Sequence, residues 1–146
     1  MIWFHAVAGG FTPVPISINA DYITAVGRLD GDHRDDIVWH GPGTVGDSVW
    51  FGEAGGTFSY QVYAVNRTYT PVTVDLYGTG RDVVIWYAPG LPSDAMWRWT
   101  ADRALSSEPL VLPTHQVPVV GAFSAGGTDG VFWYGAGSAL DVLWHR

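Results

Sequence analysis

Tryptophan recurs along this chain at a fixed interval of 47 residues. One series consists of Trp3, Trp50, Trp97 and Trp144, and a second of Trp39, Trp86 and Trp133. The same phase is kept by Asp47, Asp94 and Asp141 and by Gly43, Gly90 and Gly137. The chain, 1–146, is therefore read as one domain of three repeats, approximately 1–47, 48–94 and 95–141, with an overlap, 142–146. A gapless repeat of this length predicts copies of one small structural unit stacked side by side.

Each repeat reads as four short strands. In the middle copy we expect strands at Pro71–Leu76, Val83–Tyr87, Ala95–Trp99 and Leu105–Leu112. These segments are rich in β-branched and aromatic residues, and turns containing Gly and Pro separate them. Four strands in a repeat of about 40–50 residues are typical of one blade of a β-propeller. The sequence therefore predicts an all-β fold of propeller blades with essentially no helix.

Composition excludes several classes of partner and site. The net charge is −7 and no cluster of Lys and Arg is present, which argues against nucleic acid and against an anionic membrane surface. With no cysteine, disulfides and zinc–thiolate sites are excluded. There is no apolar run near 18 residues and no signal-peptide pattern at the N-terminus.

Two segments resemble a known repeat family. Gly27–Trp39, "GRLDGDHRDDIVW", and Val74–Gly90, "VDLYGTGRDVVIWYAPG", are similar to FG-GAP/VCBS repeats. The resemblance implies β-propellers, commonly of seven blades, like those of integrin α-chains, the Psathyrella velutina lectin and many secreted bacterial proteins. It also implies an extracellular location and, in many blades, a calcium loop of the form D-x-D-x-D-x-x-x-D.

The first copy keeps only part of that calcium loop. Asp30, Asp32 and Asp36, with the carbonyl of Arg34, stand at ligand positions, but Arg28 replaces the first aspartate. The second and third copies have lost nearly all of the ligands. Two interpretations remain open, a weak calcium site or an Asp-rich turn held by its own hydrogen bonds. The expected cofactor is accordingly none, or weakly bound calcium. Asp35, Asp82 and Asp129 persist in all copies and are expected to cap the turn.

The aromatic residues divide into core and ligand candidates. Both Trp series recur at mid-strand positions, which predicts packing between blades; the core residues are Trp3, Trp39, Trp50, Trp86, Trp97, Trp133 and Trp144. Positions that differ between copies or lie at strand ends are better candidates for binding a ligand. These are His40, Tyr87, Tyr134, Arg98 and Trp99.

No catalytic motif accompanies the repeat. The sequence lacks a G-x-S-x-G nucleophile elbow and an H-x-x-x-H metal pair. We therefore expect a non-enzymatic binding module, with a lectin-like carbohydrate site between blades as its narrower form. The alternative is a structural, self-assembling part of a larger extracellular protein, with no ligand of its own.

The phase of the repeat predicts self-association. Residues 1–5 align with residues 48–52, 95–99 and 142–146, so the third strand of the unit occurs at both ends of the sequence. Three blades span too little arc to close a ring of about four to eight blades. We expect a homo-oligomer with shared blades, a dimer with six blades being favoured over a trimer with nine.

Overall fold

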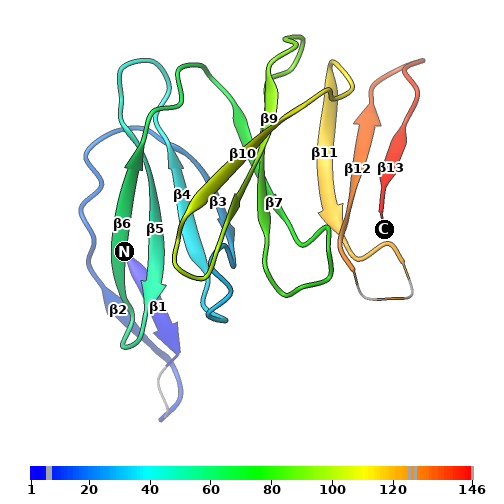
Figure 1. Ribbon diagram of the computed structural model, residues 1–146. Helices are drawn as coiled ribbons and strands as arrows, with labels where there is room; N and C mark the ends of the chain where they lie inside the picture. The colour runs from blue at the N-terminus through cyan, green and yellow to red at the C-terminus, as the bar shows by residue number, and fades with distance from the viewer. Residues whose placement is uncertain (6–7, 125, 127, 146) are drawn as a thin grey trace.

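The computed structural model describes residues 1–5, 8–124, 126 and 128–145, and all of its regular structure is β-strand. The strands form four antiparallel sheets of two, four, four and three strands, and the three larger sheets lie side by side in Figure 1. The prediction of an all-β fold made of repeated antiparallel sheets is confirmed. None of the described residues belongs to a helix that could cross a membrane.

Each sheet is a meander of strands consecutive in the chain. The hairpin contains β1 (Ile2–His5) and β2 (Phe11–Val14). The first four-stranded sheet contains β3 (Ile23–Gly27), β4 (Asp36–His40), β5 (Asp47–Glu53) and β6 (Thr57–Tyr63). The second contains β7 (Thr70–Val74), β8 (Val83–Tyr87), β9 (Asp94–Trp99) and β10 (Leu105–Leu110). The last contains β11 (Gln116–Gly121), β12 (Gly130–Gly135) and β13 (Val142–Trp144).

The turn between the second and third strand of each sheet depends on glycine. Gly43, Gly90 and Gly137 have φ angles of 77°, 79° and 75°, in the left-handed region that a residue without Cβ adopts at little cost. This requirement explains why glycine returns at these positions every 47 residues.

The repeat extends to the pairing register of the strands. Trp50 lies opposite Ile37, Trp97 opposite Val84 and Trp144 opposite Val131. The pairing register of the third strand with the fourth also repeats, in the hairpin β1–β2 and in the pairs β5–β6 and β9–β10. Trp3 lies opposite Pro13, just as Trp50 lies opposite Tyr60 and Trp97 opposite Ser107. The hairpin β1–β2 is therefore the outer half of one further sheet of the same design.

Packing between neighbouring sheets forms two apolar cores. One lies between the first and second four-stranded sheets and includes Phe51, Trp86 and Trp99. The other lies between the second and third sheets and includes Tyr87, Val131 and Trp133. The first strands of the sheets also contact one another, β3 with β7 and β7 with β11. This arrangement is consistent with blade-like units.

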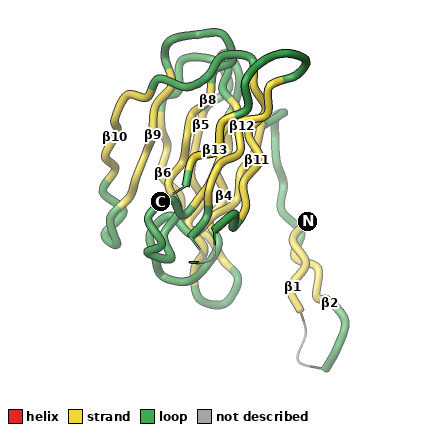
Figure 2. Tube along the Cα trace, turned by 90° about the vertical axis from the view of Figure 1, so that its right-hand side faces the viewer, coloured by secondary structure: helices red, strands yellow, loops and turns green. Residues whose placement is uncertain are grey.

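The hairpin β1–β2 stands apart from the other sheets, as Figure 2 shows. Trp3 is 61% exposed, so the prediction that it is a core residue is wrong for the single chain. The physical reason is that its hairpin has no neighbouring first and second strands to pack beside. In the other copies, Trp86 and Trp133 are buried, and Trp39, Trp50, Trp97 and Trp144 are partly buried.

Candidate binding cleft

The junction between the first two large sheets is centred on His40. Its imidazole is fully buried at the end of β4, 5.4 Å from the ring of Trp86. Nδ1 lies 2.7 Å from a carboxylate oxygen of Asp47, and Nε2 accepts a hydrogen bond from the backbone N–H of Tyr69 at 3.0 Å. Both ring nitrogens are thus engaged within the fold, which leaves His40 unable to reach a ligand.

Tyr87 has the same role at the next junction. Its ring is buried 5.1 Å from that of Trp133. The phenol donates to the carbonyl of Pro113 and accepts from the N–H of Gln116. Trp99 is also buried, and its indole N–H donates to the hydroxyl of Tyr63. The expectation that His40, Tyr87 and Trp99 are ligand residues is therefore corrected, because each satisfies its polar atoms inside the protein.

The repeated aspartate at the start of the third strand joins three segments of one sheet. Asp47 is 5% exposed and accepts hydrogen bonds from the N–H groups of Gly41 and Val65 as well as facing His40. Asp94 accepts in the same way from Ala88 and Leu112. Sequence reasoning found this aspartate only as a repeated position. Its recurrence beside the turn glycine was the signal that could have revealed its role.

The acidic loop of the first copy is occupied by its own hydrogen bonds. Asp30 accepts from the N–H of Asp32 and from the guanidinium of Arg103. Asp32 accepts from the backbone and side chain of Arg34. Two of the carboxylates that calcium would need, those of Asp30 and Asp32, are thus already paired with guanidinium groups. Among the described residues, no group of three or more His, Cys, Asp or Glu is placed to hold a metal. The donor set does not fit a calcium ion and instead forms the hydrogen-bonded turn.

Calcium is therefore expected to leave the stability of the protein nearly unchanged. Adding millimolar calcium or EDTA should shift the melting temperature by less than about 2 °C, since a ligand that does not bind the folded state cannot stabilise it. Scanning calorimetry measures this, with magnesium at equal ionic strength as the control for charge screening. A fall of about 10 °C or more in EDTA would show that the loop does bind calcium.

Asp36 differs from its neighbours because it is fully buried. Burial raises the pKa of its carboxyl from 3.8 to about 6, although the N–H groups of Gly52 and Leu29 donate to it and oppose the shift. Each oxygen accepts one of these bonds, 2.9 Å from Gly52 and 2.7 Å from Leu29. The carboxyl thus bridges the loop and β5.

This pKa predicts a loss of stability as the pH rises. Between about pH 4 and pH 6 the folded state holds a proton on Asp36 that the unfolded state has released, so the stability falls across this window, by about 3 kcal/mol from this group. Denaturant titrations at several pH values should show that Asp36→Asn lacks this part of the slope. Equal slopes in the two proteins would contradict the assignment.

One of the repeated loop aspartates, Asp82, links neighbouring sheets. Asp82 accepts a hydrogen bond from the N–H of Arg28 at 2.7 Å, and its own N–H donates to the carbonyl of Arg28. Asp35 instead pairs with the side chain of Arg28. The expectation that this aspartate caps its own turn is thus corrected for Asp82, which bonds across the junction.

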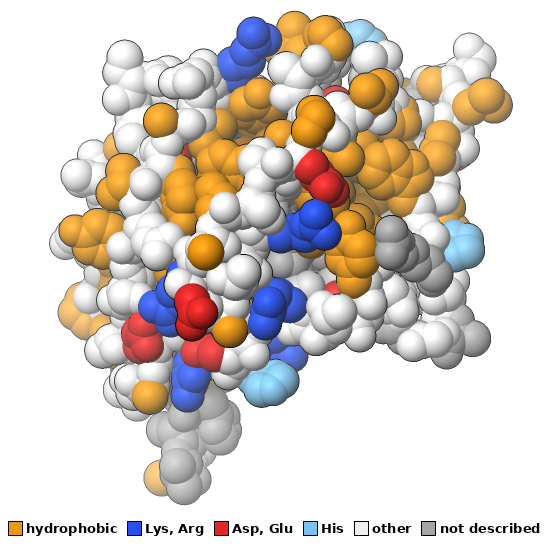
Figure 3. Space-filling model, in the orientation of Figure 1, with side chains coloured by type: hydrophobic (Ala, Val, Ile, Leu, Met, Phe, Trp, Pro, Cys, Tyr) orange, Lys and Arg blue, Asp and Glu red, His pale blue; other side chains and the backbone are white. Residues whose placement is uncertain are grey.

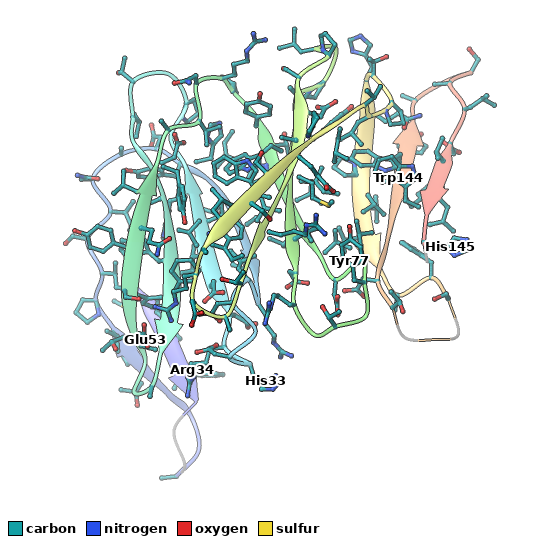
Figure 4. All side chains as sticks on the ribbon, in the orientation of Figure 1. His33, Arg34, Glu53, Tyr77, Trp144 and His145 are labelled. Carbon is teal, nitrogen blue, oxygen red and sulfur yellow. The ribbon has the colours of Figure 1, made fainter. Side chains whose placement is uncertain are left out.

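An open cleft of about 430 Å³ lies between the second and third sheets. Its lining includes Tyr77, Glu108, Trp144 and His145, three of which are labelled in Figure 4. Arg98 borders it, with its guanidinium 5.5 Å from the centre of the Tyr77 ring and 3.0 Å from a Glu108 oxygen. Arg98 and Glu108 are each more than 40% exposed, so their polar atoms can reach a ligand.

One substitution between copies helps to explain why this cleft is open. At the first junction Tyr63 lies against Trp97, with ring centres 5.4 Å apart, and a smaller hollow of about 250 Å³ remains nearby. At the second junction the repeat equivalent of Tyr63 is Leu110, which packs in the same core as Trp144. Leu110 has no ring to pack on Trp144 as Tyr63 packs on Trp97. Of the predicted ligand residues, only Arg98 lies at this cleft, and Tyr134 is exposed elsewhere.

Comparison with known proteins found no family model, no curated protein and no solved structure that matches this chain.

Proposed function

We propose that the chain is a non-enzymatic, propeller-type binding module that holds a small saccharide in the cleft between its second and third sheets. The observation that carries the proposal is the pairing there of aromatic rings with an exposed ionic pair. Trp144 offers an aromatic face for the C–H surface of a sugar, and Tyr77 holds the guanidinium of Arg98 beside it. Arg98 and Glu108 offer charged donors and acceptors for its hydroxyl groups.

The amphipathic character of the cleft fits a saccharide better than a fully apolar ligand. Arg98 is already positioned by Glu108 and by the Tyr77 ring, so little side-chain freedom is lost on binding. In Figure 3, hydrophobic side chains gather toward β5 and β6 and toward β12 and β13, with charged side chains between these areas. The resemblance to FG-GAP/VCBS repeats adds an extracellular setting to the proposal.

A glycan array followed by isothermal titration calorimetry tests this function. For the best glycan found, Arg98→Ala is expected to weaken binding by about tenfold or more, the value of one charged hydrogen bond. Arg67→Ala is the matched control, because Arg67 is an exposed arginine at the other junction. Failure to bind any glycan, or equal binding by both variants, would overturn the proposal.

A further inference from the structure

The two junctions within the chain are built from the same contacts. At the first, His40 packs on Trp86 and accepts the N–H of Tyr69. At the second, Tyr87 packs on Trp133 and accepts the N–H of Gln116. The three positions involved are each 47 residues apart, so a junction has two halves. The first half is the residue near the end of the second strand of one sheet, His40 or Tyr87. The second half belongs to the following sheet and consists of a Trp ring and a backbone N–H.

The chain also carries both halves of a third junction, unpaired with each other. Tyr134 is the repeat equivalent of His40 and Tyr87, yet it is 48% exposed. Trp39 and Tyr22 are the equivalents of the receiving Trp and N–H. These halves lie on the first and third sheets, with the second sheet between them (Figure 1), so they cannot meet within one chain.

The burial of the second strands shows which faces lack a neighbour. Every residue of β8 is buried, because the middle sheet is covered on both faces. In β4 burial alternates, with Ile37 and Trp39 only partly covered. In β12 the face carrying Phe132 and Tyr134 is the less buried one. Exposed Val117 and Val119 pair with these two residues, and exposed Val26 pairs with Ile37. Apolar faces of this kind mark an association surface.

Asp141 shows the same incompleteness in its hydrogen bonds. Asp47 and Asp94 each accept two backbone N–H groups, one of them from the segment after the fourth strand. Among the described residues, Asp141 accepts only the N–H of Gly135, because its sheet has no fourth strand. The repeat assigns the second donor to Ile18, which follows β2 and is 40% exposed.

We propose that a second copy of this chain completes this third junction. Tyr134 of one copy packs on Trp39 of the second copy, and its hydroxyl accepts the N–H of Tyr22 of that copy. The hairpin β1–β2 of the second copy lies beside β12 of the first and takes the place of the three-residue strand β13. The identical register of the hairpin and of β5–β6 and β9–β10 allows this exchange without a change in pairing.

This contact is head-to-tail, and repeating it gives a closed ring where the rotation between copies is that between neighbouring blades of a propeller. Two copies give six sheets and three copies give nine, and the usual range of about four to eight favours two. The occupant is a second copy because this chain itself carries, in matching phase, the residues that each half requires. The inference does not rest on the proposed saccharide site, but it changes one residue of that site. Trp144 lies on β13, so in the assembled protein its repeat equivalent, Trp3 of the second copy, takes its position beside the cleft.

Light scattering coupled to size-exclusion chromatography tests the assembly. The expected mass is two or three times the 15.8 kDa of one chain. Tyr134→Lys should return the mass to that of one chain, because a buried charge would replace the packed ring. Tyr60→Lys is the matched control, since Tyr60 is 68% exposed in the single chain. Its repeat equivalent, Ser107, stays exposed although its sheet forms the first junction, so Tyr60 is expected to stay exposed when the third junction forms. A wild-type mass of 15.8 kDa at micromolar concentration overturns the proposal, as does a Tyr134→Lys variant that keeps the wild-type mass.

Hydrogen exchange of the wild-type protein gives a readout that does not depend on a variant folding. The N–H of Tyr22 should be protected to a degree like those of Tyr69 and Gln116, which are hydrogen-bonded at the two junctions within the chain. This protection should fade on dilution, while that of Tyr69 should not. A Tyr22 amide that exchanges freely in the assembled protein would overturn the proposed contact.

Discussion

Trp133→Ala is expected to lower the free energy of unfolding by about 3–5 kcal/mol, the usual cost of truncating a buried aromatic side chain. Trp133 is fully buried, with ring centres 5.1 Å from Tyr87 and 5.6 Å from Trp144. Its indole N–H has no hydrogen-bond partner among the described residues, so the loss comes from packing and from the cavity left behind. Denaturant unfolding followed by circular dichroism measures it.

Tyr60→Ala provides the control for that measurement. Tyr60 is 68% exposed, and a surface truncation of this kind is expected to change the stability by no more than about 0.5 kcal/mol. If Trp133→Ala changed the stability as little as Tyr60→Ala, the Trp series would not be the packing element of the sheets.

Asp47→Ala is expected to be as destabilising as the loss of Trp133, at about 3–5 kcal/mol. Its carboxylate is bonded to the N–H groups of Gly41 and Val65 at 3.0 Å and 2.8 Å and lies 2.7 Å from Nδ1 of His40. Removing it leaves three buried polar groups without an acceptor, and water cannot easily reach them. The same denaturant measurement applies, with thermal unfolding as a second readout.

Asp102→Ala is the matched control for Asp47→Ala. Asp102 is an exposed aspartate in the turn between β9 and β10, so its removal should cost little. Equal effects of the two substitutions would mean that the loss of a negative charge, and not the loss of the buried acceptor, determines the stability.

Much of the fold could be predicted because its determinants are local and repeated. The strand expected at Val83–Tyr87 is present with those bounds. The strand expected at Leu105–Leu112 starts at Leu105 but ends two residues earlier, at Leu110. The apolar run of β8 reflects burial on both faces, and that pattern is visible in the sequence. The closure of the sheets into a propeller stays a prediction.

The site was harder to predict because the decisive contacts are distant in sequence. His40 and Tyr87 differ between copies, which suggested ligand contacts, but each accepts the same backbone N–H of the next sheet. An imidazole and a phenol are interchangeable in that task. The ion pair of Arg103 with Asp30 spans 73 residues and could not be read from the loop alone. Leu110, which lines the cleft, has no chemical signal of its own in the sequence.

The meander order of every sheet has a consequence for the rate of folding. Strands that pair are always neighbours in sequence, so each sheet can form from contacts of low sequence separation, which favours fast folding. The junctions close later, since their contacts lie 29 residues apart in the case of His40 and Tyr69. Stopped-flow refolding should therefore show a fast phase independent of protein concentration, followed, where chains associate, by a slower phase whose rate rises with concentration.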